Sequence, residues 1–355
     1  MHRRRQSVDL TQPDSESCPA VFADDGLPFL GNETMTKEVE TTPVLTEKRQ
    51  QWLAVLNGED QHSIHRQLIR MTWDATVFHV VNEARGMADP SPDGGVQLNG
   101  MVHRLFDQGF FISQCVAIRR LVDGYDLDGD RGVYSLIALL EDMERHGHLL
   151  TRRNIYDAEE LEYDDKAIEQ QFSEGLYHHY KTGEYPDDMP PNGLYLQSTT
   201  RHKHIDQLSG VAESDRSPDD QILPSVFQNL KTRVNEVCDD VARHVNKFIA
   251  HASTPESREK VEASGSPITL QHLEDAREAL CQITAFLAVY MLGDSSSDFF
   301  PIPQYEQFEY IERPLVKAAD IIKLERVWNA RQSSASERHR WTIEDYHQYV
   351  RTNCE

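Results

Sequence analysis

Several features that mark common protein classes are missing from this chain of 355 residues. It has no run of about eighteen or more apolar residues, the length that a transmembrane helix needs. Its basic start, Met1–Arg5, leads into polar residues rather than into the apolar segment of a secretion signal. We therefore expect a protein that neither spans a membrane nor is exported, and the predicted location is the cytoplasm.

Signals for β-structure and for phosphate-binding loops are also missing. No stretch alternates convincingly between apolar and polar residues, and no Gly-rich loop or internal repeat occurs. Apolar residues recur instead at three- and four-residue steps, which places them on one side of a helix. The sequence therefore predicts an all-α fold.

Cysteine is scarce and unpaired in the sequence. The chain has five cysteines that lie far apart and form no CxxC or CxxH pair: Cys18, Cys115, Cys238, Cys281 and Cys354. An odd number at such distances fits neither a disulfide framework nor a zinc site. We expect reduced thiols, several of them packed in the core.

Basic residues are fewer than acidic residues in this chain. The 36 Lys and Arg residues face 59 Asp and Glu residues, which gives a net charge of -23. A nucleic-acid-binding protein normally has a basic excess, so any contact with RNA must use a local basic patch. The candidates are Arg119–Arg120, Arg152–Arg153 and the 201–204 cluster, although short basic clusters on an acidic protein are more often solvated faces with carboxylate partners.

Patterns for metal binding are incomplete. Asp126, Asp128 and Asp130 begin like a calcium loop, but Arg131 and Ile137 stand where that loop needs Gly and Glu. The histidine pairs of the chain match no metal-binding signature. We predict an acidic turn at this aspartate run, no metal site and no cofactor.

Helical spacing is clearest in five segments, at residues 47–86, 100–123, 133–145, 222–252 and 269–291. The longest near-heptad pattern belongs to the 222–252 segment and comprises Val226, Leu230, Val234, Val237, Val241, Val245 and Phe248. The 100–123 helix is apolar on two sides, which predicts a central position, and with the 133–145 helix it is expected to form an antiparallel hairpin. Thr269 is the predicted N-cap of the last helix, which should lie antiparallel to its predecessor.

Composition divides the chain into an arm, a bundle and an extension. Residues 1–45 are too polar to bury much surface and predict a flexible arm. The bundle is expected at 46–294, interrupted by an acidic, irregular insertion at 151–221. Residues 295–355 predict a C-terminal helical extension with a linker, a short helix near 315–328 and a polar end at 341–349.

The most informative side chains for function lie at the end of the 222–252 helix. Lys247 and His251 are one helical turn apart, on a flank between the apolar stripe and the position of Arg243. A neighbouring lysine lowers the pKa of an imidazole, and a neutral imidazole can act as a general base on a ribose hydroxyl. The alternative is a boundary histidine that packs at a helix C-terminus.

The segment Asn246–Ala252, together with Ile118–Asp123 and Tyr134–Leu136, resembles the HEPN superfamily and within it the AbiU-type abortive-infection proteins. The resemblance covers roughly residues 100–150 and 222–292. It implies an up-down bundle of four or five helices, often dimeric, with roles in phage defence and toxin–antitoxin systems, and we expect this chain to act in phage defence or in a stress response. It also implies metal-independent RNase activity in members that carry an Arg four to six residues before the His. In this chain Val245 stands where that Arg would be, and Arg243 lies eight positions before His251.

The resemblance implies one mechanism and one set of partners. His251 would be the base, Lys247 would steady the phosphate and Asn246 would position the ribose. Arg119 or Arg120 would be auxiliary cations, and Asp123 would orient an arginine through a pair on the same helix. The expected partners are RNA, a second copy in a homodimer, and a protein partner or antitoxin.

Two other functions fit the same residues. The chain can be a non-catalytic binding or scaffold protein in which Val245 records the loss of chemistry, or a ligand-sensing domain with an enclosed apolar pocket near the 100–123 helix. A catalytic protein is expected to hold Lys247 and His251 in an open cleft beside a cation, whereas a scaffold would hold them in bonded packing.

Overall fold

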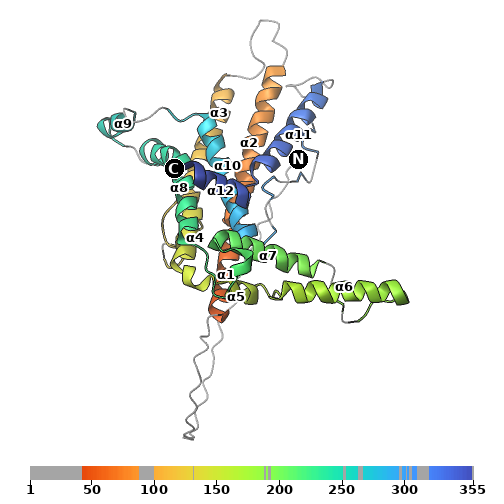
Figure 1. Ribbon diagram of the computed structural model, residues 1–355. Helices are drawn as coiled ribbons and strands as arrows, with labels where there is room; N and C mark the ends of the chain where they lie inside the picture. Colours follow the sequence, from red (N-terminus) through yellow and green to blue (C-terminus); the bar gives the residue numbers. More distant parts are fainter. Residues whose placement is uncertain are drawn as a thin grey trace, which may run out of the picture. The chain divides into compact units, whose positions relative to one another are not determined.

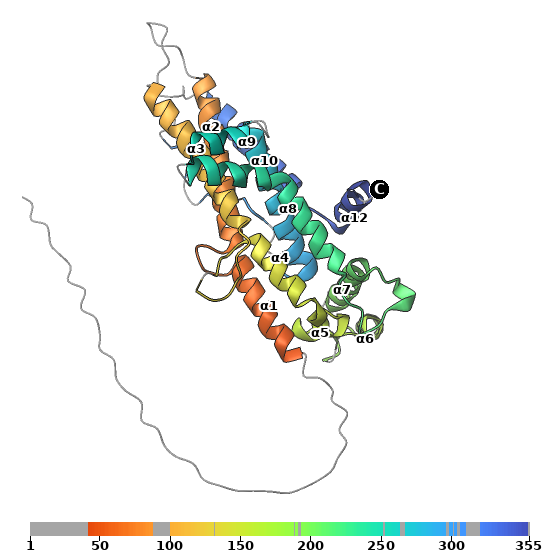
Figure 2. The ribbon, with the colours of Figure 1, turned by 90° about the vertical axis from the view of Figure 1, so that its left-hand side faces the viewer.

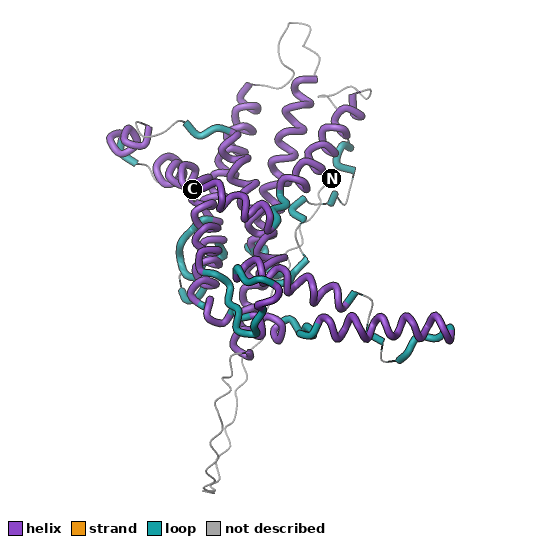
Figure 3. Tube along the Cα trace, in the orientation of Figure 1, coloured by secondary structure: helices purple, strands orange, loops and turns teal. Residues whose placement is uncertain are grey.

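The structure, a computed structural model, describes residues 42–87, 100–130, 132–187, 189–190, 193–250, 253–262, 267–295, 298–300, 302–303, 306–309 and 320–353. Within these ranges all regular structure is helical (Figure 3), apart from one isolated bridge between Thr151 and Gln221. The predicted all-α class is therefore confirmed. Residues 1–41 of the predicted arm lie outside the described residues, and the helix already begins at Thr42, with Leu45 buried.

The α-helices of the described residues are α1 (Thr42–Asn57), α2 (Ile64–Met87), α3 (Gly100–Leu121), α4 (Leu136–Arg145), α5 (Arg152–Ala158), α6 (Asp165–Thr182), α7 (Leu194–Ser209), α8 (Pro224–His244), α9 (Pro255–Glu262), α10 (Leu270–Phe286), α11 (Ile321–Arg338) and α12 (Ile343–Asn353). Short π-helical turns follow two of them, at Val245–Ile249 after α8 and at Leu287–Met291 after α10.

Helices α8 and α10 form the centre of the bundle and run in opposite directions, as expected (Figure 2). Helices α3 and α4 pack along α8, and α2 packs against α3 and α10. The expected apolar stripe of α8 faces this core, because Val226, Leu230, Val234 and Val241 are all at most 2% exposed. Thr269 caps α10 by accepting a hydrogen bond from the backbone N–H of His272, as predicted.

The predicted hairpin of the 100–123 and 133–145 helices is wrong. Helices α3 and α4 instead follow each other along α8 in the same direction (Figure 2). The connecting loop closes on itself, because the hydroxyl of Ser135 donates a hydrogen bond to the carbonyl of Asp123. Ser135 also caps α4 through Ala138, so the chain resumes its path almost where α3 ended.

The second apolar stripe of α3 is only partly buried. Cys115, Ile118 and Leu121 are fully buried, whereas the side chains of Leu105 and Ile112 are 74% and 45% exposed. One side of α3 therefore faces the core and part of the other reaches the surface, so the prediction of a central helix is corrected.

The insertion at 151–221 is acidic but not irregular. It contains α5, α6 and α7, and the last two pack on each other as a hairpin that projects from the bundle (Figure 1). Asp164 caps α6, and Gly183 ends it with a φ of 79°, a backbone conformation that favours glycine. The apolar spacing was patchy because α6 buries only Ile168 and Gly175.

The C-terminal extension is part of the bundle. Helix α11 packs along α2 and spans Ile321–Arg338, so it continues ten residues beyond the expected end at 328, whereas residues 315–319 of the expected helix lie outside the described residues. The predicted polar end is wrong, because Trp341, Ile343 and Tyr346 are all at most 9% exposed and belong to the main core. Trp341 just before α12, and Ile343 and Tyr346 within it, therefore bury apolar surface that holds this segment against the bundle.

Three cysteines confirm the expectation of core-packed thiols. Cys115, Cys238 and Cys281 are free and buried, and burial raises the pKa of each thiol to about 12. Cys18 and Cys354 lie outside the described residues.

No helix in the described part of the chain combines the length and the apolar character needed to cross a membrane.

Candidate functional site

The predicted site lies where α8 changes into a π-helical turn. The helix was expected to continue to residue 252, but the backbone N–H of Ala250 donates to the carbonyl of Val245, five residues earlier, at 2.7 Å. Such a turn inserts one residue into the helix and is frequent at functional sites. Asn246 and Lys247 lie within it, whereas His251, the predicted base, lies outside the described residues.

Three of the predicted side chains come together between α3 and this turn. The Nη1 of Arg119 lies 3.0 Å from Oδ2 of Asp123, one turn later on α3. The Nε of Arg119 donates to Oδ1 of Asn246 at 3.1 Å. The expected pair on one helix is therefore present, and its arginine is held by both neighbours with a side chain that is 28% exposed.

The other predicted cations point elsewhere. The Nζ of Lys247 donates to Oγ of Ser257 on α9 at 3.0 Å. Arg243 is exposed and pairs with Asp240 on its own helix at 3.1 Å, and Arg120 is exposed on α3. Among the described contacts, none of these three side chains joins the group formed by Arg119, Asp123 and Asn246.

Val245 is buried. Its side chain is 3% exposed and belongs to the main core. A guanidinium placed there without a carboxylate would cost several kcal/mol, because the charge would leave water unpaired. The local fold is thus built for an apolar side chain at this position.

His244 lies beside the predicted site but was not among the residues expected there. Its ring stacks on Phe248 at 4.8 Å and meets Phe111 of α3 edge-on at 5.9 Å. Burial lowers the pKa of His244 below its ordinary value of 6.5, so the ring is neutral at pH 7. The spacing of His244 and Phe248, one turn apart, was the signal for this pair, but only the tertiary structure adds Phe111.

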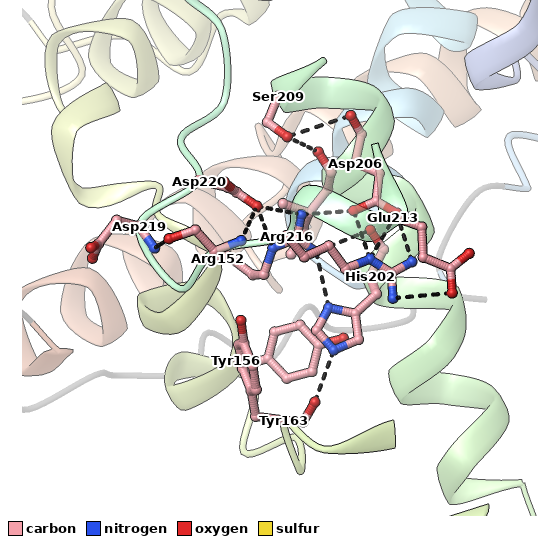
Figure 4. A network of polar contacts seen from close by, with 12 residues as sticks. Arg152, Tyr156, Tyr163, His202, Asp206, Ser209, Glu213, Arg216, Asp219 and Asp220 are labelled. Atoms are coloured by element: carbon pink, nitrogen blue, oxygen red, sulfur yellow. Dashed lines mark hydrogen bonds and ion pairs between the residues drawn. The ribbon is translucent and has the colours of Figure 1, made fainter. Parts of the chain in front are cut away.

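The basic clusters at 152–153 and 201–204 are only partly the solvated faces that were expected, because Arg153 and Lys203 are exposed and the other basic side chains are buried or half-buried. Arg152 and His202 are 0% and 2% exposed, and Arg152 forms ion pairs with Asp206 at 2.7 Å and with Asp220 at 2.8 Å (Figure 4). Arg152 also contacts Nδ1 of His202 at 2.9 Å. The carboxylate partners were foreseen and their burial was not, and the network links α5 to α7 and to the segment before α8.

A second group of charged residues lies where α10 and α11 pack near α2. We name it the Glu274 cluster, and it consists of Glu274, Arg277, Arg331 and Arg338. The Oε1 of Glu274 lies 2.8 Å from Arg331, 3.5 Å from Arg338 and 3.7 Å from Arg277. The sequence could not reveal it, because Arg331 is 57 residues from Glu274.

An apolar groove of about 340 Å³ lies beside α3, near the position expected for a sensing pocket. Its walls come from Trp73, Val77, Phe78, Leu105, Phe106 and Phe110. It is not the enclosed pocket that the ligand-sensing hypothesis requires, because Leu105 on its rim is 74% exposed.

Metal ligands do not converge in the part of the chain that the structure describes, where no three His, Cys, Asp or Glu side chains are grouped as a metal site.

Comparison with protein-family models, with curated proteins and with solved structures finds no match to this chain. The geometry above is therefore the basis for a functional proposal.

Proposed function

We propose that this chain is a non-catalytic helical binding protein with a HEPN-like bundle, in which the residues of an RNase site have taken structural roles. The observation that carries the proposal is the burial of Val245, which is 3% exposed in the main core. An RNase of this type needs a cation at that position to stabilise the charge that develops on the phosphate. A charge at this buried position would lose its contact with water.

The neighbouring cations support the same conclusion. Arg119 is hydrogen-bonded to Asn246 and paired with Asp123, and Lys247 is bonded to Ser257. Each of these cations is therefore already held by neighbours within the protein, so it would bind a phosphate from a restrained position and with only its remaining N–H donors. This bonded packing is what the scaffold hypothesis expects, and an open cleft with free cations is what catalysis expects.

Metal-independent RNA cleavage by His251 is the second candidate, and one contact favours it. Arg119 of α3 reaches Asn246 in the π-helical turn at 3.1 Å, which brings a cation next to the segment that leads to His251. In that mechanism Arg119 would replace the missing arginine, and the exchange of its bond from Asn246 to a phosphate would accompany substrate binding.

One assay separates the two candidates. Purified wild-type chain, His251→Ala and the control His148→Ala, an exposed histidine on a different segment, are incubated with total RNA and defined tRNAs in EDTA. We expect intact RNA in all three. Discrete fragments from wild type and His148→Ala, but not from His251→Ala, would establish the RNase and refute our proposal.

The biological setting and the partners belong to the same proposal. The resemblance to abortive-infection proteins favours phage defence, with a second copy, an antitoxin-like protein or RNA as the bound partner. Sedimentation of the purified chain with and without RNA tests two of these partners directly. If the chain is a monomer and does not bind RNA, a protein partner is the expected ligand.

A further inference from the structure

The Glu274 cluster contains more positive than negative charge. Arg277, Arg331 and Arg338 all approach the single carboxylate of Glu274, and Arg338 also lies 3.7 Å from Glu278. Among the described residues, three guanidinium groups face two carboxylates here, which leaves an excess of one positive charge. In a chain with a net charge of -23, this local excess is unusual.

Arg277 lies at the bottom of the cluster. Its side chain is 9% exposed, its only described ion pair is the 3.7 Å approach to Glu274, and its Nε has no hydrogen-bond partner among the described residues. A guanidinium remains charged at this depth, and a buried charge without full pairing is costly. An unsatisfied donor of this kind points to a partner from solution, either a water molecule or an anion.

Two histidines, His79 and His339, lie beside the three arginines of the cluster and line the same cavity. Burial is the main cause, and the charge of Arg331 the second, that lowers the pKa of His79 to about 4. Burial, and then the charges of Arg277 and Arg338, lowers the pKa of His339 to about 3. Glu274 opposes this effect at His79. Both rings are therefore neutral at pH 7, and each can donate one N–H without adding charge.

A cavity of about 20 Å³ lies among these side chains. That volume accepts one atom of the size of a water oxygen. Arg331 and Arg338, with side chains 30% and 40% exposed, lie at its outer side, so the cavity is within reach of solvent. Glu278 and Arg338 also line an adjoining open pocket of about 460 Å³, which can hold the remainder of a larger molecule.

We propose that the Glu274 cluster binds an oxyanion of the phosphate class, with one oxygen inside the cavity against Arg277, Arg331 and Arg338. Planar guanidinium groups bind such oxygens with paired hydrogen bonds, which a water molecule cannot match. The anion neutralises the excess charge and gives the Nε of Arg277 a partner. The site shares no residue with the predicted RNase site, so it stands whether or not RNA is cleaved.

The test is a calorimetric titration of the full chain with inorganic phosphate and with phenyl phosphate, at pH 7 and constant ionic strength, with sodium chloride as the reference. The variant Arg331→Gln removes a half-exposed member of the cluster and leaves the buried Arg277 in place. Arg326→Gln, an exposed arginine on the same helix and outside the cavity, is the matched control. Circular dichroism checks that each variant is folded.

We expect saturable binding of one phosphate group by wild type and Arg326→Gln, and at least tenfold weaker binding by Arg331→Gln. Tighter binding of phenyl phosphate would identify an organic ligand whose body lies in the adjoining pocket, and tighter binding of inorganic phosphate would identify the free ion. Absence of saturable binding to wild type, or equal affinity in Arg331→Gln, would overturn the proposal and leave a buried water in the cavity.

Discussion

At position 245, the RNase hypothesis and the packing of the bundle favour different side chains. The RNase hypothesis would place an arginine there, but the bundle buries Val245 to 3% exposure. We predict that Val245→Arg lowers the free energy of unfolding by about 3–5 kcal/mol, because the new charge is buried without a partner. Urea denaturation followed by tryptophan fluorescence measures the loss.

Lys247→Arg is the control for this change, because Lys247 is half-buried and already carries a positive charge. Its effect should stay within about 0.5 kcal/mol, as for most surface substitutions. A stable Val245→Arg protein that cleaves RNA would show that the chain retains a competent site and lacks only the cation.

A buried carboxylate makes stability depend on pH. Asp142 is 3% exposed and accepts hydrogen bonds from Nε1 of Trp52 at 2.8 Å and from Nζ of Lys48 at 3.2 Å. Burial alone would raise the pKa of Asp142, but these bonds outweigh it and hold the pKa below 3.8. A lowered pKa contributes stability above the unfolded value, and this contribution is lost as the pH falls through the folded value.

We predict that Asp142→Asn costs about 1.5–3 kcal/mol at pH 7, the usual contribution of hydrogen bonds to a charged group. The cost should shrink as the pH falls below 3.8 and through the lowered pKa of Asp142, because the wild-type carboxyl then takes up its proton. Unfolding free energies of both proteins between pH 7 and pH 2.5 provide the measurement. Parallel curves would mean that Asp142 does not contribute to the pH dependence.

At the scale of elements, one buried arginine joins the two ends of the insertion, because it links α5, which packs on α1, to α7 and to the segment before α8. Arg152 begins α5 and pairs with Asp206 of α7 and with Asp220 in the segment before α8 (Figure 4). We predict that Arg152→Met costs about 3 kcal/mol, because two carboxylates lose a buried partner. The α6–α7 hairpin should then loosen first, and limited proteolysis between 183 and 193 should become faster.

The adjacent Arg153 provides the comparison for this prediction, because its side chain is exposed. Arg153→Met should leave both the unfolding free energy and the proteolysis pattern close to those of wild type. If Arg153→Met loosened the hairpin as much as Arg152→Met, the exposed charge rather than the buried network would be responsible.

At the scale of the whole molecule, the C-terminal extension cannot be removed without damage. Trp341, Ile343 and Tyr346 belong to the main core, although they come 47 or more residues after Asp294, where the predicted bundle ends. We predict that a chain ending at residue 294 loses about 1.5–3 kcal/mol for each of these side chains, and that it aggregates because the core is exposed.

Scanning calorimetry and size-exclusion chromatography of the shortened chain measure these effects. A control that ends at residue 353 removes only Cys354 and Glu355, which follow α12, and it should behave as the full chain does. A shortened protein that unfolds at the wild-type temperature would show that the extension is a separate module.

Local spacing carried the predictions that were confirmed. The all-α class, the buried stripe of Val226, Leu230 and Val234, and the cap at Thr269 all depend on residues within two helical turns of one another. The pair of Arg119 and Asp123 was foreseen for the same reason, since four residues separate them on one helix.

Only the tertiary structure decided which distant segments meet. The direction of α4 depends on the loop closed by Ser135, the burial of Trp341 depends on a groove made by other helices, and the Glu274 cluster joins residues 57 positions apart. No periodicity within one segment encodes such contacts, because they arise from the complementary packing of whole helices. The sequence by itself therefore determined the helices and their inner faces, and the packing decided where the charged groups converge.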